Sequence, residues 1–196
     1  SAEVMQMVNK YFGTIKKGPN VRDLRPNVPR LTQDVYCGYT DNIYLPMTQI
    51  VFPTVPNYHK DEAALDILSS LMGEGSNSVF YKNFVKSEKA IQAGVQHPCR
   101  ELSGEFQFIV VSYPKWGEDQ NLYFNEIESQ IRSSIDEWEQ TGFTDEQLKM
   151  AKMDMESSII NYKISLSSKV STISSWEWLA KGKHNISSDI ARYNNV

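Results

Sequence analysis

The stretch from Asp61 to Val85 constrains the fold more than any other part of the chain. Asp61 and Glu62 favour the start of a helix, because the amino-terminal end of a helix dipole is positive. The glycines of 73–75 predict a break, and the serines of 76–78 mark the start of a second, short helix. The first helix is expected to bury apolar residues that recur at three- and four-residue steps: Ala64, Ile67, Leu68 and Leu71.

Four other segments are rich in the β-branched and aromatic residues that favour strands. They span residues 32–40, 45–54, 90–96 and 104–113. The strongest signal is the run from Phe106 to Tyr113, and Asp41-Asn42 is suited to a turn between the first two segments. Residues 97–103 are too many for a tight hairpin. We therefore expect two pairs of strands in an antiparallel sheet.

The first thirty residues predict a helix and an extended connector. Residues 3–15 carry an apolar helix face: Val4, Met7 or Val8, Tyr11 and Ile15. Gly18-Pro19 ends this helix, since proline cannot continue a helix and glycine tolerates a left-handed exit. Residues 19–30 hold three prolines and three arginines, which favours a solvated linker over a basic patch: the arginines are Arg22, Arg25 and Arg30.

The chain from residue 119 onward predicts a block of helices. Residues 119–140 carry a stripe of 3.6-residue period: Phe124, Ile127, Ile131, Ile135 and Trp138. Thr144 and Gln147 form a capping box that starts the next helix, which is expected to bury Leu148, Ala151, Met155, Ile159 and Tyr162. After a bend at 165–168, a further helix to Gly182 is expected to bury Val170, Ile173, Trp176 or Trp178, and Leu179. Residues 192–196 resemble the approach to another helix start.

Composition and charge narrow the class of protein. With 40% hydrophobic and 11% aromatic residues among 196, the chain is expected to fold as a single α+β domain over 1–196, an antiparallel sheet covered by helices. Its parts are an opening helix at 1–18, a connector at 19–30, the sheet with its helix pair at 31–113, and a helical block at 119–196. A net charge of -4 gives no reason to expect a nucleic-acid partner. No apolar run approaches the ~20 residues that span a bilayer.

The three histidines do not form a zinc-peptidase motif. That motif needs two histidines one helical turn apart with a glutamate beside them, so that both imidazoles meet one metal and the carboxylate holds the attacking water. His59, His97 and His184 are far apart in the sequence. His59 and Glu62 could ligate a metal at a helix start, but without a third ligand a solvated helix start is favoured.

Two cysteines raise the question of a nucleophile. His97-Pro98-Cys99 places a thiol near a base in the sequence, but adjacency supplies neither a hydrogen bond nor an oxyanion site, so a structural histidine is favoured. Cys37 and Cys99 both lie in contexts typical of strands. Two buried free thiols are favoured over a disulfide between them.

Two other groups of residues also have a functional and a structural interpretation. The loop 73–78 is glycine-rich, but it follows a helix and lacks the Lys-Ser/Thr of a phosphate-binding loop, which favours a turn. Trp176 and Trp178, with Tyr193, are favoured as packing residues over a ligand platform. The residues alone therefore predict no catalytic residue and no metal ligand, and leave the substrate-binding residues unknown.

Four segments, in register, resemble the insulinase/pitrilysin family of zinc metallopeptidases. They look like a helix ending in KYFG, an ALDIL helix after a strand, a G-x-S-R-L-Y turn and a G-x-T-x-E-E-L-x-x-A-K helix start. In this chain they are Val8–Gly18, Met47–Phe52 with Ala64–Leu68, Gly73–Tyr81 and Gly142–Lys152. Val79 stands where the turn usually has arginine.

The resemblance implies a place for the chain in a larger enzyme. Family members pair half-domains of one fold, of which one carries zinc and the next helps to enclose the peptide. The chain resembles the second half, which implies a catalytic half-domain and a peptide substrate as partners, and zinc in the parent protein but not in this chain. Distal family domains use an arginine and a tyrosine to bind the substrate backbone, but Val85 lies near the arginine position and 84–93 has no tyrosine. No site residue is therefore carried over.

Two alternatives stay open. One is a non-enzymatic scaffold or assembly subunit of the same fold that has lost its metal site, and the other is a stand-alone α+β binding module. Because the chain opens without methionine inside a helical pattern, we expect it to be a piece of a longer protein. An H-x-x-E-H motif encoded upstream of Ser1 would favour the peptidase.

Overall fold

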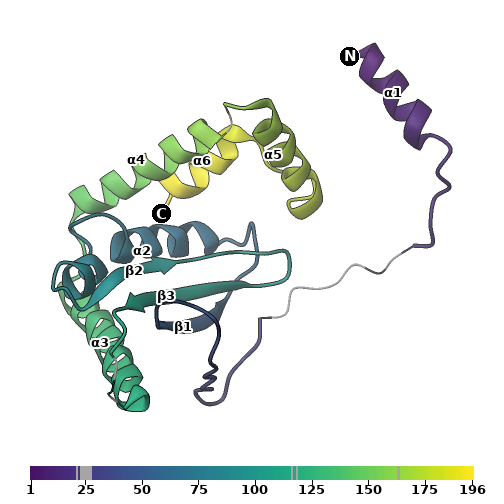
Figure 1. The fold of residues 1–196 in the computed structure, drawn as a ribbon. Coiled ribbons are helices and arrows are strands. Elements are labelled where there is room, and N and C mark those ends of the chain that lie inside the picture. The colour runs from purple at the N-terminus through teal and green to yellow at the C-terminus, as the bar shows by residue number, and fades with distance from the viewer. Residues whose placement is uncertain (21, 23–27, 116, 118, 163) are drawn as a thin grey trace.

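A three-stranded antiparallel sheet is the centre of the fold, with strand order β1-β3-β2 (Figure 1). The computed structural model describes residues 1–20, 22, 28–115, 117, 119–162 and 164–196. The strands are β1 (Met47–Thr54), β2 (Ala90–Gln96) and β3 (Gly104–Ser112). Alternate residues of β3 are buried because successive side chains of a strand point to opposite faces. The sheet confirms the α+β class and the three predicted strands from residue 45 onward.

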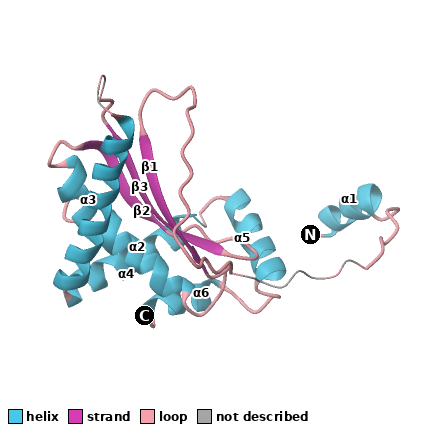
Figure 2. Cartoon of the chain, turned by 90° about the horizontal axis from the view of Figure 1, so that it is seen from below, coloured by secondary structure: helices cyan, strands magenta, loops and turns pink. Residues whose placement is uncertain are grey.

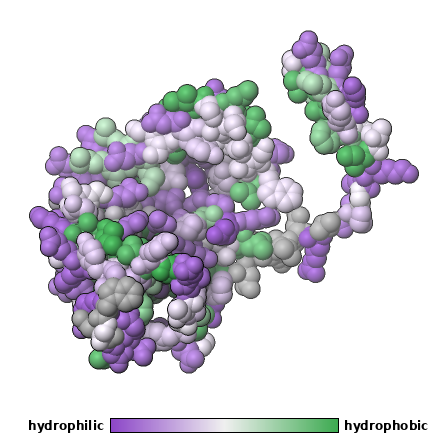
Figure 3. Space-filling view, viewed as in Figure 1, coloured by the Kyte–Doolittle hydropathy of each residue, from purple (hydrophilic) through white to green (hydrophobic). Residues whose placement is uncertain are grey.

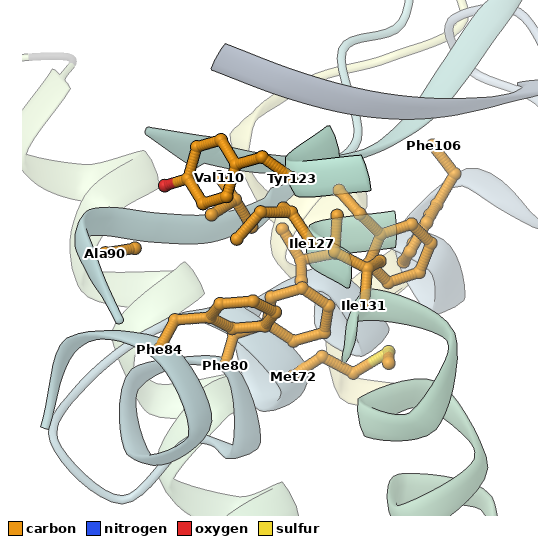
Figure 4. Close-up of a cluster of buried hydrophobic side chains, with 11 residues drawn as sticks. Met72, Phe80, Phe84, Ala90, Phe106, Val110, Tyr123, Ile127 and Ile131 are labelled. Atoms are coloured by element: carbon orange, nitrogen blue, oxygen red, sulfur yellow. The ribbon is translucent and has the colours of Figure 1, made fainter. Parts of the chain in front are cut away.

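The hydrophobic core lies on one face of this sheet, beneath three helical segments (Figure 4). These are α2 (Glu62–Gly73), the short π-helical turn η1 (Tyr81–Val85) and α3 (Gln120–Thr141). The core residues are Met72, Phe80, Phe84, Ala90, Val95, Phe106, Phe108, Val110, Tyr123, Ile127 and Ile131. Gly73 permits the close packing of α2 on β2, since a Cβ there would lie 2.4 Å from the Val95 backbone nitrogen.

A second helical layer covers α2 on the side away from the sheet (Figures 1 and 2). It consists of α4 (Asp145–Tyr162) and α6 (Ile186–Asn194), with α5 (Leu166–Leu179) between them in the sequence. Because α2 is packed on both sides, its buried residues do not form the single stripe that the sequence predicted: Ala64 is exposed, while Ala63 and Met72 are buried.

The predicted buried faces of the C-terminal helices are only partly correct. The capping box at Thr144 and Gln147 is confirmed, with hydrogen bonds of 2.8 and 3.2 Å. On α4, Ala151 is buried but Tyr162 is 61% exposed, and on α5 Val170 and Ile173 are exposed because no described element covers them. The prediction for residues 192–196 is wrong, since Arg192 lies inside α6.

The N-terminal helix α1 lies apart from the rest of the chain (Figures 1 and 2). Helix α1 (Ala2–Phe12) is confirmed but has no buried residue. The strand predicted at 32–40 is wrong: the segment is not a strand and its side chains are exposed. Its contacts are with α3, where Tyr36 donates a hydrogen bond to Glu128 at 3.2 Å, so its β-prone residues do not reach a sheet edge. The connector predicted at 19–30 falls partly on 21 and 23–27, Arg25 included, which lie outside the described residues.

Candidate functional site

Polar side chains meet where the end of β1, the helix α2 and the residue after β2 lie side by side. The His97 side chain is fully buried, with Nδ1 2.7 Å from Asp66 Oδ1 and Nε2 3.0 Å from Thr54 Oγ1. The hydroxyl of Tyr193, on α6, donates to Asp66 Oδ2 at 2.7 Å. The result is a chain of hydrogen bonds that links β1 to α2 and α6.

An ion pair lies next to this chain. The Glu62 carboxylate accepts hydrogen bonds from the Arg192 guanidinium and, at 2.6 Å, from the backbone N–H of Tyr58. The same guanidinium lies 5.0 Å from the centroid of the Tyr58 ring. We call the whole set the α2–α6 network: Thr54, Tyr58, Glu62, Asp66, His97, Arg192 and Tyr193.

The surroundings of the network keep its two tyrosine side chains protonated, and Arg192 binds the Glu62 carboxylate. Burial, with the nearby Asp189 charge, raises the pKa of Tyr58 to about 12. Burial and the Asp66 charge raise the pKa of Tyr193. Burial also raises the pKa of Glu62, although the Arg192 hydrogen bond opposes this shift. Neither phenol is therefore available as a base at neutral pH, and that of Tyr193 donates its hydrogen bond to Asp66.

A thiol lies beside the imidazole of the network. Cys99 Sγ is 3.6 Å from His97 Nε2, and Asp66 holds the opposite ring nitrogen, so the three groups follow the order of a nucleophile, base and orienting acid. The same Nε2 is also 3.0 Å from Thr54, and burial raises the pKa of Cys99 to about 12. A thiol held protonated cannot attack, which favours the structural interpretation of His97.

His59 and Glu62, for which the sequence favoured a solvated helix start over a metal site, are not brought together. His59 Nδ1 lies 3.5 Å from Asp61, while Glu62 turns toward Arg192. In the part of the chain that the structure describes, no group of three His, Cys, Asp or Glu side chains could hold a metal ion. The absence of catalytic and metal-binding residues from this chain stays a prediction.

The other residues singled out by the sequence have structural contacts. Ser78 accepts a hydrogen bond from the Tyr81 backbone N–H at 3.2 Å, so the loop 73–78 caps a helix. Trp176 donates to Asp189 at 2.9 Å, whereas Trp178 is 63% exposed. Both cysteines are free, but Cys37 is exposed rather than buried because its predicted strand does not form.

Sequence reasoning missed Arg192, and placed Tyr193 only in a packing role with the tryptophans. The helix that carries both begins with a capping box between Asn185 and Ser188. This N-x-x-S spacing is the signal that could have predicted α6. Their partners on α2 lie 127 and 130 residues away, which no local pattern reveals.

Comparisons with known proteins give a consistent picture. Residues 1–155 match the family described as peptidase M16 inactive domain. Zinc protease PqqE of Helicobacter pylori (strain ATCC 700392 / 26695) is 21% identical over 164 residues, which are 82% of this chain and 36% of that protein. The crystal structure of a protease from Helicobacter pylori matches 100% of this chain and 47% of its own, with 20% identity and a TM-score of 0.76.

A structure of the inactive peptidase domain of a proposed zinc protease from Bordetella parapertussis matches 76% of each chain, with 13% identity and a TM-score of 0.63. Because these two structures are only 20% and 13% identical to this chain, their similarity shows a shared fold and nothing more. The chain spans less than half the length of the two Helicobacter pylori proteins. No helix in the described residues is long and apolar enough to cross a membrane.

Proposed function

Because the chain belongs to the peptidase M16 inactive domain family, as its resemblance to the insulinase/pitrilysin family predicted, we propose that it is the structural and substrate-enclosing half-domain of a zinc-dependent peptidase. The family match over residues 1–155 carries this proposal, and the name of the zinc protease of Helicobacter pylori supports it. The proposed partners are a catalytic half-domain of the same protein and a peptide substrate. Bound zinc, in that other half, would supply Lewis-acid polarisation of the scissile carbonyl.

The open face of the sheet is the proposed wall of the peptide chamber. Residues that point away from the core pair across the strands, such as Met47 with Val111 and Val51 with Gln107. Met47 and Val51 are 50% and 40% exposed. An exposed sheet face with apolar and amide side chains offers contact area for an unfolded peptide without selecting one charge.

The α2–α6 network supports a structural role for the side of the fold away from this wall. Its carboxylates are engaged by Arg192, His97 and Tyr193, so they hold elements together instead of facing a substrate. The chain alone is therefore expected to bind no stoichiometric zinc and to cleave no peptide.

The test uses the full-length gene product. Zinc content is measured together with hydrolysis of an unstructured peptide, with and without a chelator. About one zinc per chain and chelator-sensitive cleavage are expected, and the 196-residue chain is the control that should show neither. A folded, zinc-free and inert full-length protein would indicate the scaffold or assembly subunit instead. Stoichiometric metal in the control would contradict the proposal.

A further inference from the structure

We call the first 46 residues the N-terminal arm, and its described residues bury almost no surface. Of its described residues up to 44, all are exposed except the half-buried Val28. The arm nevertheless carries large apolar side chains that are 42–98% exposed: Val4, Met5, Met7, Val8, Tyr11, Phe12, Ile15, Leu31, Val35, Tyr36, Tyr39, Ile43 and Tyr44. So many exposed apolar side chains in one segment indicate a surface that a partner covers.

Helix α1 has the form of a docking helix. Val4, Val8 and Tyr11 recur at four- and three-residue steps and lie on one face, while Gln6 and Asn9 lie on the opposite face. Figure 3 shows the two kinds of surface on the outlying helix. An isolated helix of 11 residues is too short to be stable in water, where about 12–15 residues are marginal. The sequence therefore makes a helix that needs a partner for its stability.

We call the described chain from Met47 onward the body. It does not supply that partner in the structure. The arm contacts the body through surface groups, such as Asp34, which pairs with Arg132 at 3.0 Å on α3. No residue of α1 is buried. The core under the sheet is complete without the arm, since all of its buried residues lie between Met72 and Ile131.

The comparison with the longer protease shows where a partner could come from. Its match covers 100% of this chain, α1 included, so the arm belongs to the shared fold. This chain accounts for 47% of that protease, and the remaining 53% (100 − 47) is about the size of one more such chain. The first 46 residues hold six Lys and Arg against four acidic residues, a net +2 (6 − 4), while α1 itself carries one of each, Glu3 and Lys10. The apolar face of the helix, and not its charge, therefore indicates the kind of surface that fits it, which is an apolar groove.

We propose that α1 docks through Val4, Val8 and Tyr11 onto the remainder of the same protein, the catalytic half, and not onto the body of its own half-domain. This inference rests on the proposed function for the identity of the partner. The arm then acts as a strap that joins the two halves, with its own helix stabilised only in the assembled protein.

Hydrogen exchange in the full-length protein and in the 196-residue chain tests the proposal. The α1 amides should exchange on the order of 100-fold more slowly in the full-length protein. Val8→Asp with Tyr11→Asp should remove that protection, because both carboxylates would enter the apolar interface. Gln6→Asp with Asn9→Asp is the matched control, with the same charge change on the opposite face of the same helix, and should keep it.

Three outcomes would overturn the inference. These are unprotected α1 amides in the full-length protein, equal protection in the 196-residue chain, which would indicate docking on its own body, and protection in that chain that rises with concentration, which would indicate a second copy. Zinc content, measured on the same samples, separates this test from that of the proposed function. If α1 is protected in a full-length protein that holds no zinc and cleaves no peptide, the docking of α1 is supported and the proposed peptidase function is contradicted.

Discussion

The N-terminal arm and the body of the chain carry similar apolar side chains, but they differ in what surrounds them. Phe12 on α1 is 63% exposed, whereas Phe84 on η1 is fully buried and its ring centroid lies 5.6 Å from that of Phe80. Both residues lie in helical segments. The difference teaches that an amphipathic pattern specifies a local structure, while burial needs a partner surface from elsewhere in the protein.

The largest expected difference between the arm and the body is in the stability that one phenylalanine contributes. Phe84→Ala should lower the free energy of unfolding by about 3–5 kcal/mol, because the removed ring leaves a cavity. Phe12→Ala in the same chain should change it by less than about 0.5 kcal/mol, as for other exposed residues. Urea unfolding measures both, and a similar loss for the two variants would contradict the separation of arm and body.

The ion pairs offer a second comparison. Arg192→Met should cost about 3 kcal/mol, since it leaves the buried Glu62 carboxylate without its guanidinium. Arg132→Met breaks the exposed pair with Asp34 of the arm and should cost at most about 1 kcal/mol. The double variant Glu62→Leu/Arg192→Met is informative, because removing both charges should recover part of the loss. No recovery would show that packing, not charge, explains the first result.

Two glycines sharpen the comparison at the level of the backbone. A Cβ on Gly104 would lie 2.4 Å from the Val55 carbonyl oxygen, so Gly104→Ala should destabilise the chain by about 1–3 kcal/mol. At Gly38 of the arm, no atom of the described residues other than its own chain neighbours lies within 4 Å of the same position. Gly38→Ala should therefore have almost no effect on the urea midpoint, and a large effect would mean that the arm is packed.

The smallest effect concerns the two thiols, one in the body and one in the arm. Cys99, with a pKa of about 12, should hold on the order of one part in 10⁴ thiolate at pH 8 and react slowly with iodoacetamide. Exposed Cys37 should react first, as read by mass spectrometry of the folded chain. The folded pKa lies above the ordinary value, so the contribution of Cys99 to stability should fall as pH rises from about 8.5 toward 12. Faster labelling of Cys99 would favour the nucleophile interpretation.

Elements that depend on residues close together in the sequence could be predicted, whereas contacts between distant segments could not. The strand at 104–112 and the capping box at Thr144 are specified by neighbouring residues, and both were predicted correctly. The strand expected at 32–40 has the right residues, but its pairing needs a sheet edge that it does not reach. The contacts of Arg192 and Tyr193 with α2 depend on how the helices pack, which no sequence spacing encodes.

The three-stranded sheet has one further consequence, for the solubility of the chain on its own. In the described residues β1 and β2 each pair only with β3, so both outer edges of the sheet carry backbone groups that could recruit another strand. Pro53 interrupts the row of N–H donors on β1, which hinders the addition of a foreign strand there. Edge β2 has no proline, so self-association of the chain, if it occurs at high concentration, should begin at β2.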